Sequence, residues 1–298
     1  MAEQRTSDVE PLCRIYSSSL LEVRSMLEFK RVPRNRLERF CMDLCLVALS
    51  VRTGYLFDAF SLSDMVTPPV EMLVQIIAAM RQVSPAFESV IAIHDPTFDQ
   101  LFFVNMNLLR FRCGQSVSKS ESEQTYAYLD GWTSFVHLLQ PPQLMPVAPA
   151  RVQDLALELC HVSGLDGELP VSTMLSASHP PGIPDIVSLA AVLLEYPVAY
   201  VPASMEETSF LAGVRLDVYH CTLSWSHADH RPSGFISTEH TLLKFSCPSI
   251  IGDANADLSV RQLVERLQTR FDPRLRQAGF SGTLRIIHTV ETLDRVAL

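Results

Sequence analysis

The stretch RNRLERFCMDLCLVALSVRTGYLFDAF, residues 34–60, contains a helical pattern followed directly by an extended one. Its apolar residues recur at helical spacing and form a wide stripe: Leu37, Phe40, Cys41, Leu44, Val47 and Ala48. Gly54 is typical of a helix end, and the aromatic run at 55–58 is typical of a short strand. We therefore predict a helix over 34–54 that leads into a strand, the transition expected of an α/β protein.

The same two patterns alternate along the rest of the chain. Helical spacing covers the ranges 8–29, 67–83, 151–162 and 259–279, and the apolar run 186–203 is predicted to be a helix leading into a strand. Further strands are expected at 89–95 and 283–290. We expect six runs to share one sheet: 55–58, 100–105, 125–130, 198–201, 211–224 and 241–247.

These elements predict a single α/β domain over residues 1–298, with a mixed parallel/antiparallel sheet flanked by helices. The stretch 138–150 carries four prolines and is predicted to be a loop or an internal linker. The serine-rich stretch 114–124 is predicted to be an exposed loop.

The composition is that of a folded protein with an acidic surface. Hydrophobic residues make up 47% of the chain and charged residues 19%, with a formal net charge of −9. Binding to nucleic acid or to an anionic membrane surface is therefore not expected. The basic residues are almost all arginine, the exceptions being Lys30, Lys119 and Lys244. Guanidinium groups recognise anions well, but the scattered positions favour a compositional bias over a binding site.

Seven cysteines are present, at spacings that match no common disulfide or zinc pattern. We expect all of them to be free thiols, which indicates a reducing compartment. The first twelve residues lack the apolar segment of a secretory signal, and the apolar run 186–203 is interrupted by Glu195 and Pro197. The sequence therefore predicts an intracellular, cytoplasmic protein without a membrane span.

Common catalytic motifs are absent. The chain has no phosphate-binding P-loop, no G-x-G-x-x-G, no G-x-S-x-G, no H-E-x-x-H and no EF-hand loop. Whether the protein is an enzyme is left open, and the sequence indicates no particular cofactor.

Three predicted strands end on an acid, at Asp58, Asp95 and Asp130. In open α/β sheets the carboxyl ends of strands line the ligand crevice, where acids hold a metal, a hydroxyl or an amine, or act as a general base. The alternative is that each aspartate caps a turn, as Asp commonly does. His94, beside Asp95, is a further candidate for an oriented base.

Four histidines lie within a short segment beside Cys221: His220, His227, His230 and His240. Together they could bind zinc, yet their spacing matches no common zinc pattern. We therefore expect no metal site there and keep the four histidines as weaker candidates.

Several segments resemble an uncharacterised family whose type member is named only as an open reading frame on chromosome 1. The resemblance is carried by YLFDAF, LFFVN, YAYLD, LLEYPVAYV, LAGVRLDVY, LLKFSCP and the closing VETLDRVAL. It implies a domain of unknown function, with acidic positions at Asp58 and Asp130 and no clear counterpart of Asp95.

The sequence therefore favours a small-ligand pocket around Asp58 and Asp130, with a cationic ligand or a metal between the two carboxylates. The alternative is a non-catalytic interaction or scaffold protein that uses the loops 111–124 and 226–240 as contact surfaces. A small molecule or a protein is the expected partner, and the oligomeric state is left open.

Overall fold

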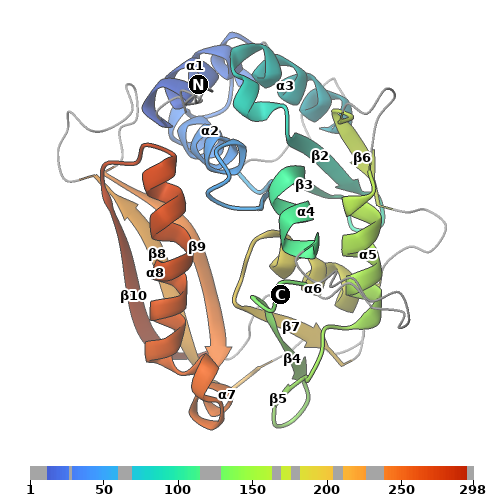
Figure 1. The fold of residues 1–298 in the computed structure, drawn as a ribbon, viewed down its shortest axis with the longest axis vertical. Helices are drawn as coiled ribbons and strands as arrows, with labels where there is room; N and C mark the ends of the chain where they lie inside the picture. Colours follow the sequence, from blue (N-terminus) through green and yellow to red (C-terminus); the bar gives the residue numbers. More distant parts are fainter. Residues whose placement is uncertain are drawn as a thin grey trace, which may run out of the picture.

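The computed structural model describes the chain in eight segments (Figure 1). These are residues 12–26, 29–59, 69–114, 129–162, 169–175, 182–203, 211–225 and 238–293. Within them, α-helices alternate with short and long strands, and the strands form three sheets. The predicted α/β class with mixed parallel and antiparallel pairing is confirmed.

Most predicted helices are present, with shorter bounds than their patterns suggest. The α-helices are α1 (Leu12–Ser25), α2 (Arg34–Ala48), α3 (Pro69–Val83), α4 (Met106–Gly114), α5 (Ala150–Cys160), α6 (Ile183–Leu193), α7 (Ser249–Ala254) and α8 (Val260–Gln277). Short 3-10 turns, η2 and η5, cover Pro85–Phe87 and Ala256–Leu258.

The first sheet is mixed, with the strand order β1-β3-β2-β6. It comprises β1 (Gly54–Leu56), β2 (Val90–Asp95), β3 (Gln100–Asn105) and β6 (Ser172–Met174). β2 and β3 form an antiparallel hairpin, β1 pairs antiparallel with β3, and β6 pairs parallel with β2.

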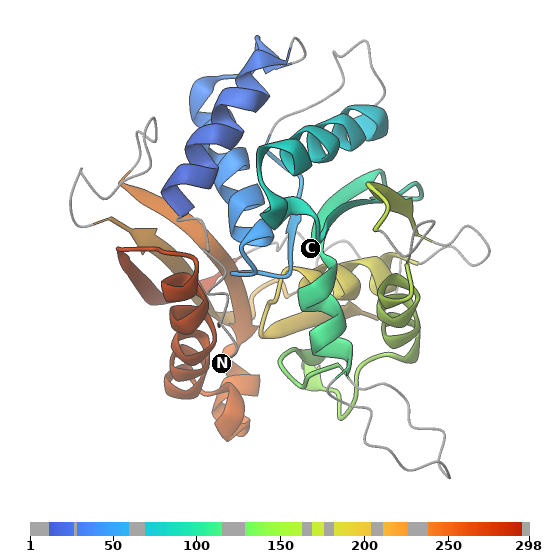
Figure 2. The ribbon, with the colours of Figure 1, turned by 45° about the horizontal axis from the view of Figure 1, so that its top comes forward.

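Alternate residues of this sheet enter two different hydrophobic layers. Val90, Ala92 and Phe103 face the core with α2 and α3, whereas Ile93 and Phe102 face the core with α4, α5 and α6. Figure 2 shows the β2–β3 hairpin between α3 on one side and α4 with α5 on the other.

The second sheet, with the order β5-β4-β7, comprises β4 (Ser134–Leu138), β5 (Gln143–Leu144) and β7 (Val198–Pro202). β4 pairs parallel with β7 and antiparallel with β5, so this sheet is also mixed. The proline-rich stretch 138–150 therefore contains a two-residue strand, and its Gln140–Pro141 peptide is cis.

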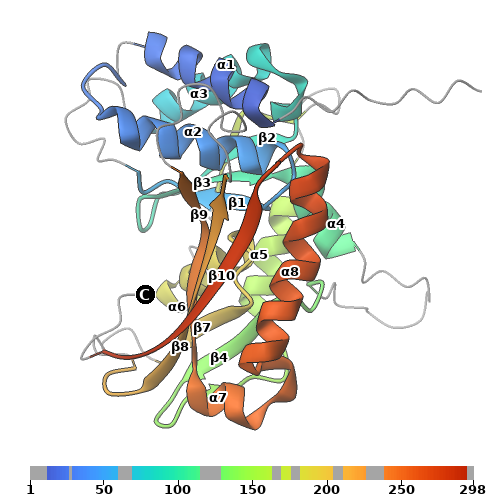
Figure 3. The same ribbon diagram turned by 90° about the vertical axis from the view of Figure 1, so that its left-hand side faces the viewer.

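The third sheet is fully antiparallel, in the order β10-β8-β9. It comprises β8 (Arg215–Ser224), β9 (Glu239–Pro248) and β10 (Thr283–Thr292). Helix α8 lies along one face of it (Figure 3). The buried residues of α8 are spaced four apart and form one apolar stripe: Leu263, Leu267, Phe271 and Leu275.

The expectation of one shared sheet is wrong, because the strands divide among three. Strand propensity reports a segment's fit to a pleated surface and not its partner, so it cannot assign strands to sheets. Of the expected strand 125–130, residues 125–128 lie outside the described residues. Leu129 and Asp130 are described and are not in a strand.

The sequence predicts that Gly54 ends the helix, and this prediction is wrong. Helix α2 ends at Ala48, and Ser50 adopts the left-handed backbone (φ 58°) just after it. Gly54 is instead the first residue of β1, where a Cβ atom would lie 2.9 Å from the carbonyl oxygen of Leu193. The glycine is therefore required by close packing of β1 against the end of α6.

A buried ion-pair cluster joins α8 to the rest of the molecule. At its centre is Glu195, which is fully buried and sits in a left-handed turn (φ 59°) after α6. Arg270 and Arg274 of α8 approach its carboxylate to 2.6 and 2.9 Å, and the backbone N–H of Thr53 donates to it at 2.7 Å. Paired buried charges of this kind fix how α8 docks.

Candidate functional site

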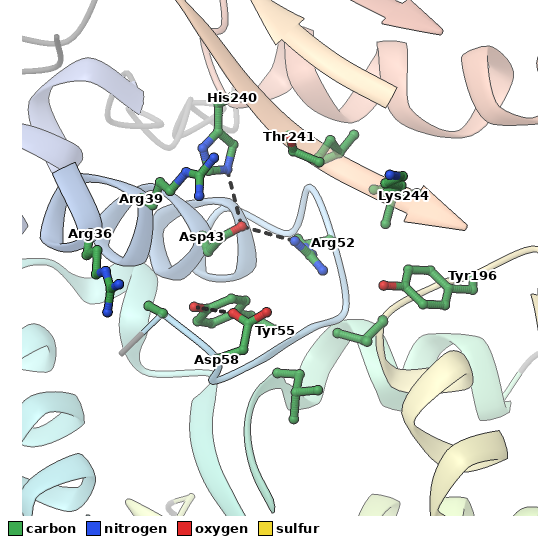
Figure 4. A pocket seen from close by; sticks show the side chains of 15 residues that line it. Arg36, Arg39, Asp43, Arg52, Tyr55, Asp58, Tyr196, His240, Thr241 and Lys244 are labelled. Atoms are coloured by element: carbon green, nitrogen blue, oxygen red, sulfur yellow. Dashed lines mark hydrogen bonds and ion pairs between the residues drawn. The ribbon is translucent and has the colours of Figure 1, made fainter. Parts of the chain in front are cut away.

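A cavity of about 560 Å³ opens between α2, the end of β1, the turn after α6, and β9 (Figure 4). Ten of its side chains are polar or aromatic: Arg36, Arg39, Asp43, Arg52, Tyr55, Asp58, Tyr196, His240, Thr241 and Lys244. The cavity therefore combines residues from three distant parts of the sequence.

Helix α2 supplies one wall. Arg36, Arg39 and Asp43 are spaced three and four residues apart, so they lie on one face of the helix. The apolar residues of the same helix, including Leu37 and Phe40, are buried in the core. The amphipathic pattern that packs α2 thus also turns these three polar side chains toward the cavity.

Asp43 connects α2 to the loop before β1 and to β9. Its Oδ1 accepts a hydrogen bond from Arg52 Nη1 at 3.1 Å and lies 3.2 Å from Nε2 of His240 on β9. All three residues are buried. The carboxylate therefore fixes the positions of a guanidinium and an imidazole at the cavity.

Basic side chains outnumber acidic ones in the cavity. Arg36, Arg39, Arg52 and Lys244 oppose Asp43 and Asp58, a formal surplus of two positive charges with His240 neutral. Arg36, Arg39 and Lys244 form no ion pair with any residue that the structure describes. On a chain of net charge −9, this is a local field of opposite sign.

Arg52 has unused hydrogen-bonding capacity. Its side chain donates one hydrogen bond, to Asp43, among the described residues, although a guanidinium carries five N–H donors. Its Nε is buried and has no partner there. A buried donor without an acceptor is costly, and an anion bound in the cavity could supply acceptors to this guanidinium.

Two tyrosines complete the lining. Burial, together with the nearby charges of Asp43 and Asp58, raises the pKa of Tyr55 far above its usual value, and burial raises the pKa of Tyr196. Both phenols therefore stay protonated at neutral pH. The hydroxyl of Tyr55 lies 3.4 Å from Oδ1 of Asp58, which is exposed.

The structure places Asp58 in this cavity, two residues beyond the end of β1. Asp130 is not among the lining residues. Its carboxylate accepts from Arg112 Nε at 3.2 Å and from Arg270 Nη2 at 2.8 Å in the buried ion-pair cluster. The expected pocket shared by Asp58 and Asp130 is therefore wrong, because Asp130 is used in holding α4 and α8 together.

Asp95 and His94 belong to the β2–β3 turn. Asp95 is fully buried, and its Oδ1 accepts from the backbone N–H of Thr97 at 3.0 Å. His94 Nε2 lies 3.2 Å from Oδ1 of Asp99 across the same turn. These contacts correspond to the turn-capping alternative.

The four histidines do not gather into one site among the described residues. His220 contacts Thr241, with Nε2 and Oγ1 3.0 Å apart, and His240 contacts Asp43. His227 and His230 lie outside the described residues. Within the described part of the chain, no group of three or more His, Cys, Asp or Glu side chains could hold a metal ion.

All seven cysteines are free thiols, as predicted. Cys247 is fully buried beside Asp217, and burial raises its pKa to about 12. It is therefore a thiol at neutral pH and not a nucleophile.

The sequence did not single out Arg36, Arg39, Asp43, Arg52 or Lys244. One signal was present, since Arg36, Arg39 and Asp43 are charged residues at helical spacing on the same helix as the apolar stripe. The arginine bias was a second signal, but it does not show which arginines meet.

No family model, curated protein or solved structure matches the chain, so the resemblance drawn from the sequence stays a prediction. None of the helices in the described segments has both the length and the apolar character needed to cross a bilayer.

Proposed function

We propose that the protein binds a small anionic molecule carrying a phosphate group in the cavity between α2 and β9. The observation that carries this proposal is the surplus of basic side chains around a buried arginine with unused donors. Sequence alone favoured a cationic ligand at paired acids, and the separation of Asp130 from Asp58 removes the basis for that preference.

The arrangement of charges fits a multivalent anion better than a metal. Arg36 and Arg39 project from α2, Lys244 projects from β9, and Arg52 lies between the two walls (Figure 4). Guanidinium groups donate paired N–H bonds to phosphate oxygens, and such charge-assisted bonds are stronger than neutral ones. A phosphate bound between the walls would accept from both.

The acidic and aromatic residues suit the uncharged part of such a ligand. The exposed carboxylate of Asp58 can accept hydrogen bonds from ligand hydroxyls, and the phenol of Tyr55, which donates to that carboxylate, can accept one. A cavity of about 560 Å³ lies within the range that holds small metabolites. The ligand class is therefore a phosphate ester with a hydroxyl-bearing body.

The test is a set of calorimetric titrations and thermal-shift measurements with defined probes. Inorganic phosphate, pyrophosphate and ribose 5-phosphate should bind and raise the melting temperature, whereas ribose and magnesium chloride should not. Arg39→Gln and Lys244→Gln should each weaken ribose 5-phosphate binding by about tenfold or more. Arg261→Gln is the matched control, because Arg261 is exposed on α8 and pairs with Glu265.

Two results would contradict the proposal. One is stabilisation by magnesium and by none of the phosphate probes. The other is a phosphate affinity that Arg39→Gln and Lys244→Gln leave at the level of the Arg261→Gln control.

A further inference from the structure

Strand β10 forms an open edge of the antiparallel sheet. All ten of its residues pair with β8, from Thr283 opposite Ser224 to Thr292 opposite Arg215. No strand in the described part of the chain pairs with its other side. In Figures 1 and 3, β10 lies at the outer side of the molecule, away from the other two sheets. Every second residue of β10 therefore presents a backbone N–H and C=O outward.

This edge lacks features that usually prevent strands from pairing with another chain. β10 contains no proline and no lysine, and its register with β8 is unbroken, whereas the one irregularity of the sheet lies between β8 and β9 at Cys221/Thr222. Six of its ten residues are β-branched. Ile287 and Val290 are 37% and 45% exposed.

The charges on the edge are arranged symmetrically and have opposite signs. Arg285 and Glu291 each lie three residues from His288, one on either side. When two copies of a strand pair antiparallel about a two-fold axis at one residue, positions equidistant from it face each other. About His288, Arg285 of each copy would therefore face Glu291 of the other.

We propose that two copies of this protein associate through β10, antiparallel and centred on His288, so that their three-stranded sheets form one continuous sheet. Ile286 then faces Val290 of the other copy, and Ile287 faces Thr289, pairings of β-branched residues that favour strand association. The two Arg285–Glu291 pairs flank this apolar centre and select the register. Charges of a single sign along the edge would oppose self-pairing, whereas Arg285 and Glu291 have opposite signs.

His288 at the centre does not disfavour the pairing. Its Nε2 lies 2.8 Å from Oδ1 of Asp217 within the same copy, so each imidazole already has an acidic partner. The proposed dimer is also separate from the anion cavity, since none of the cavity residues lies on β10. Neither proposal depends on the other.

The test is sedimentation velocity of the full chain over a range of micromolar concentrations. The wild type should approach twice the monomer mass of 33.3 kDa. Arg285→Glu and Glu291→Arg should each weaken dimerisation by about tenfold or more, because each creates two facing like-charge pairs. The double variant, with both substitutions, should restore wild-type dimerisation. Arg261→Glu makes the same charge change on α8 and should have no effect.

A wild type that stays at the monomer mass at the highest concentration would overturn the proposal. Dimerisation that Arg285→Glu and Glu291→Arg leave unchanged would place the contact elsewhere and would also overturn it. Failure of the double variant to regain dimerisation, while its circular dichroism matches the wild type, would overturn the register centred on His288.

Discussion

Asp43 determines the chemistry of the cavity at the scale of single residues. It holds Arg52, nine positions away, and His240, almost two hundred positions away, through one carboxylate oxygen. In the sequence it is one polar residue among the apolar residues of a helix, and no local pattern reveals partners so distant. Asp58 was found from the sequence because it lies just beyond a short strand, two residues after Leu56, a position that a local pattern does reveal.

Substitution of Asp58 shows whether the ligand of the cavity is an anion or a cation. Asp58→Asn removes a negative charge from a cavity with a positive surplus, so we expect phosphate affinity to stay equal or to rise, by up to about fivefold for an exposed charge. The measurement is calorimetric titration with pyrophosphate, against Asp99→Asn as an exposed aspartate outside the cavity. Loss of phosphate binding in Asp58→Asn would contradict this assignment of charges.

Glu195 is the residue whose loss should cost the most stability. Glu195→Gln takes from Arg274 its buried acidic partner and leaves Arg270 with Asp130 alone, and breaking buried pairs in this way costs about 3–5 kcal/mol. The free energy of unfolding in urea should fall by that amount at pH 7. Glu265→Gln, at an exposed pair on α8, should leave the free energy of unfolding nearly unchanged. Equal effects of the two substitutions would contradict the role of the cluster.

The same glutamate predicts a dependence on pH. Burial alone raises the pKa of Glu195, but Arg112, Arg274 and Arg270 outweigh burial and lower it from 4.5 to about 2. A carboxyl whose folded pKa is depressed stabilises the fold above its unfolded pKa and loses that contribution as the pH falls through the folded value. The stability difference between wild type and Glu195→Gln should therefore narrow from pH 4.5 toward pH 2. A difference that is constant over this interval would contradict the depressed pKa.

At the scale of elements, the long periodic segments were predictable and the short ones were not. Helices α2, α5 and α8 have apolar residues at regular helical spacing, and the spacing alone identifies them. Strand β6 has three residues and β5 has two, and each exists because a neighbouring strand supplies hydrogen bonds. Helix α4 follows β3 without a break, so its start has no turn residue to mark it.

Gly54 gives an element-scale prediction. Gly54→Ala would place a Cβ atom 2.9 Å from the Leu193 carbonyl oxygen, so β1 must shift away from α6. We expect a loss of about 1–3 kcal/mol in the free energy of unfolding, the usual range for overpacking. Gly114→Ala is the control, because nothing lies within 4 Å of its added Cβ. Comparable stability of the two variants would show that β1 does not pack as closely as described.

At the scale of the whole molecule, the sequence predicts the fold class but not the grouping of strands. The chain returns to the first sheet after leaving it, since β6 pairs with β2. The sequence also does not show which charged residues meet, because they too come from distant parts of the chain. Arg112, Arg270 and Arg274 meet in one cluster and Arg36, Arg39 and Arg52 line one cavity, although in the sequence all six appear scattered.

The cysteines test the packing of the whole molecule. Intact mass after alkylation in denaturant without reductant should show seven modified thiols, since all seven are free. In the native protein, the half-buried Cys13 should react ahead of the fully buried Cys41 and Cys45. Fewer than seven adducts in denaturant would contradict the free-thiol assignment. Fast native labelling of Cys41 or Cys45 would contradict the packing of α2.

The most direct test of the anion-binding account observes Arg52 itself, by nuclear magnetic resonance of arginine Nε–Hε groups during a titration with inorganic phosphate. The Arg52 signal, assigned by its loss in Arg52→Lys, should shift saturably because its guanidinium has unused donors in the cavity. In Arg39→Gln the same shift should require more phosphate, and the signal of the exposed Arg261 should not follow it. An Arg52 signal that stays fixed, or that moves only in parallel with Arg261, would contradict the account.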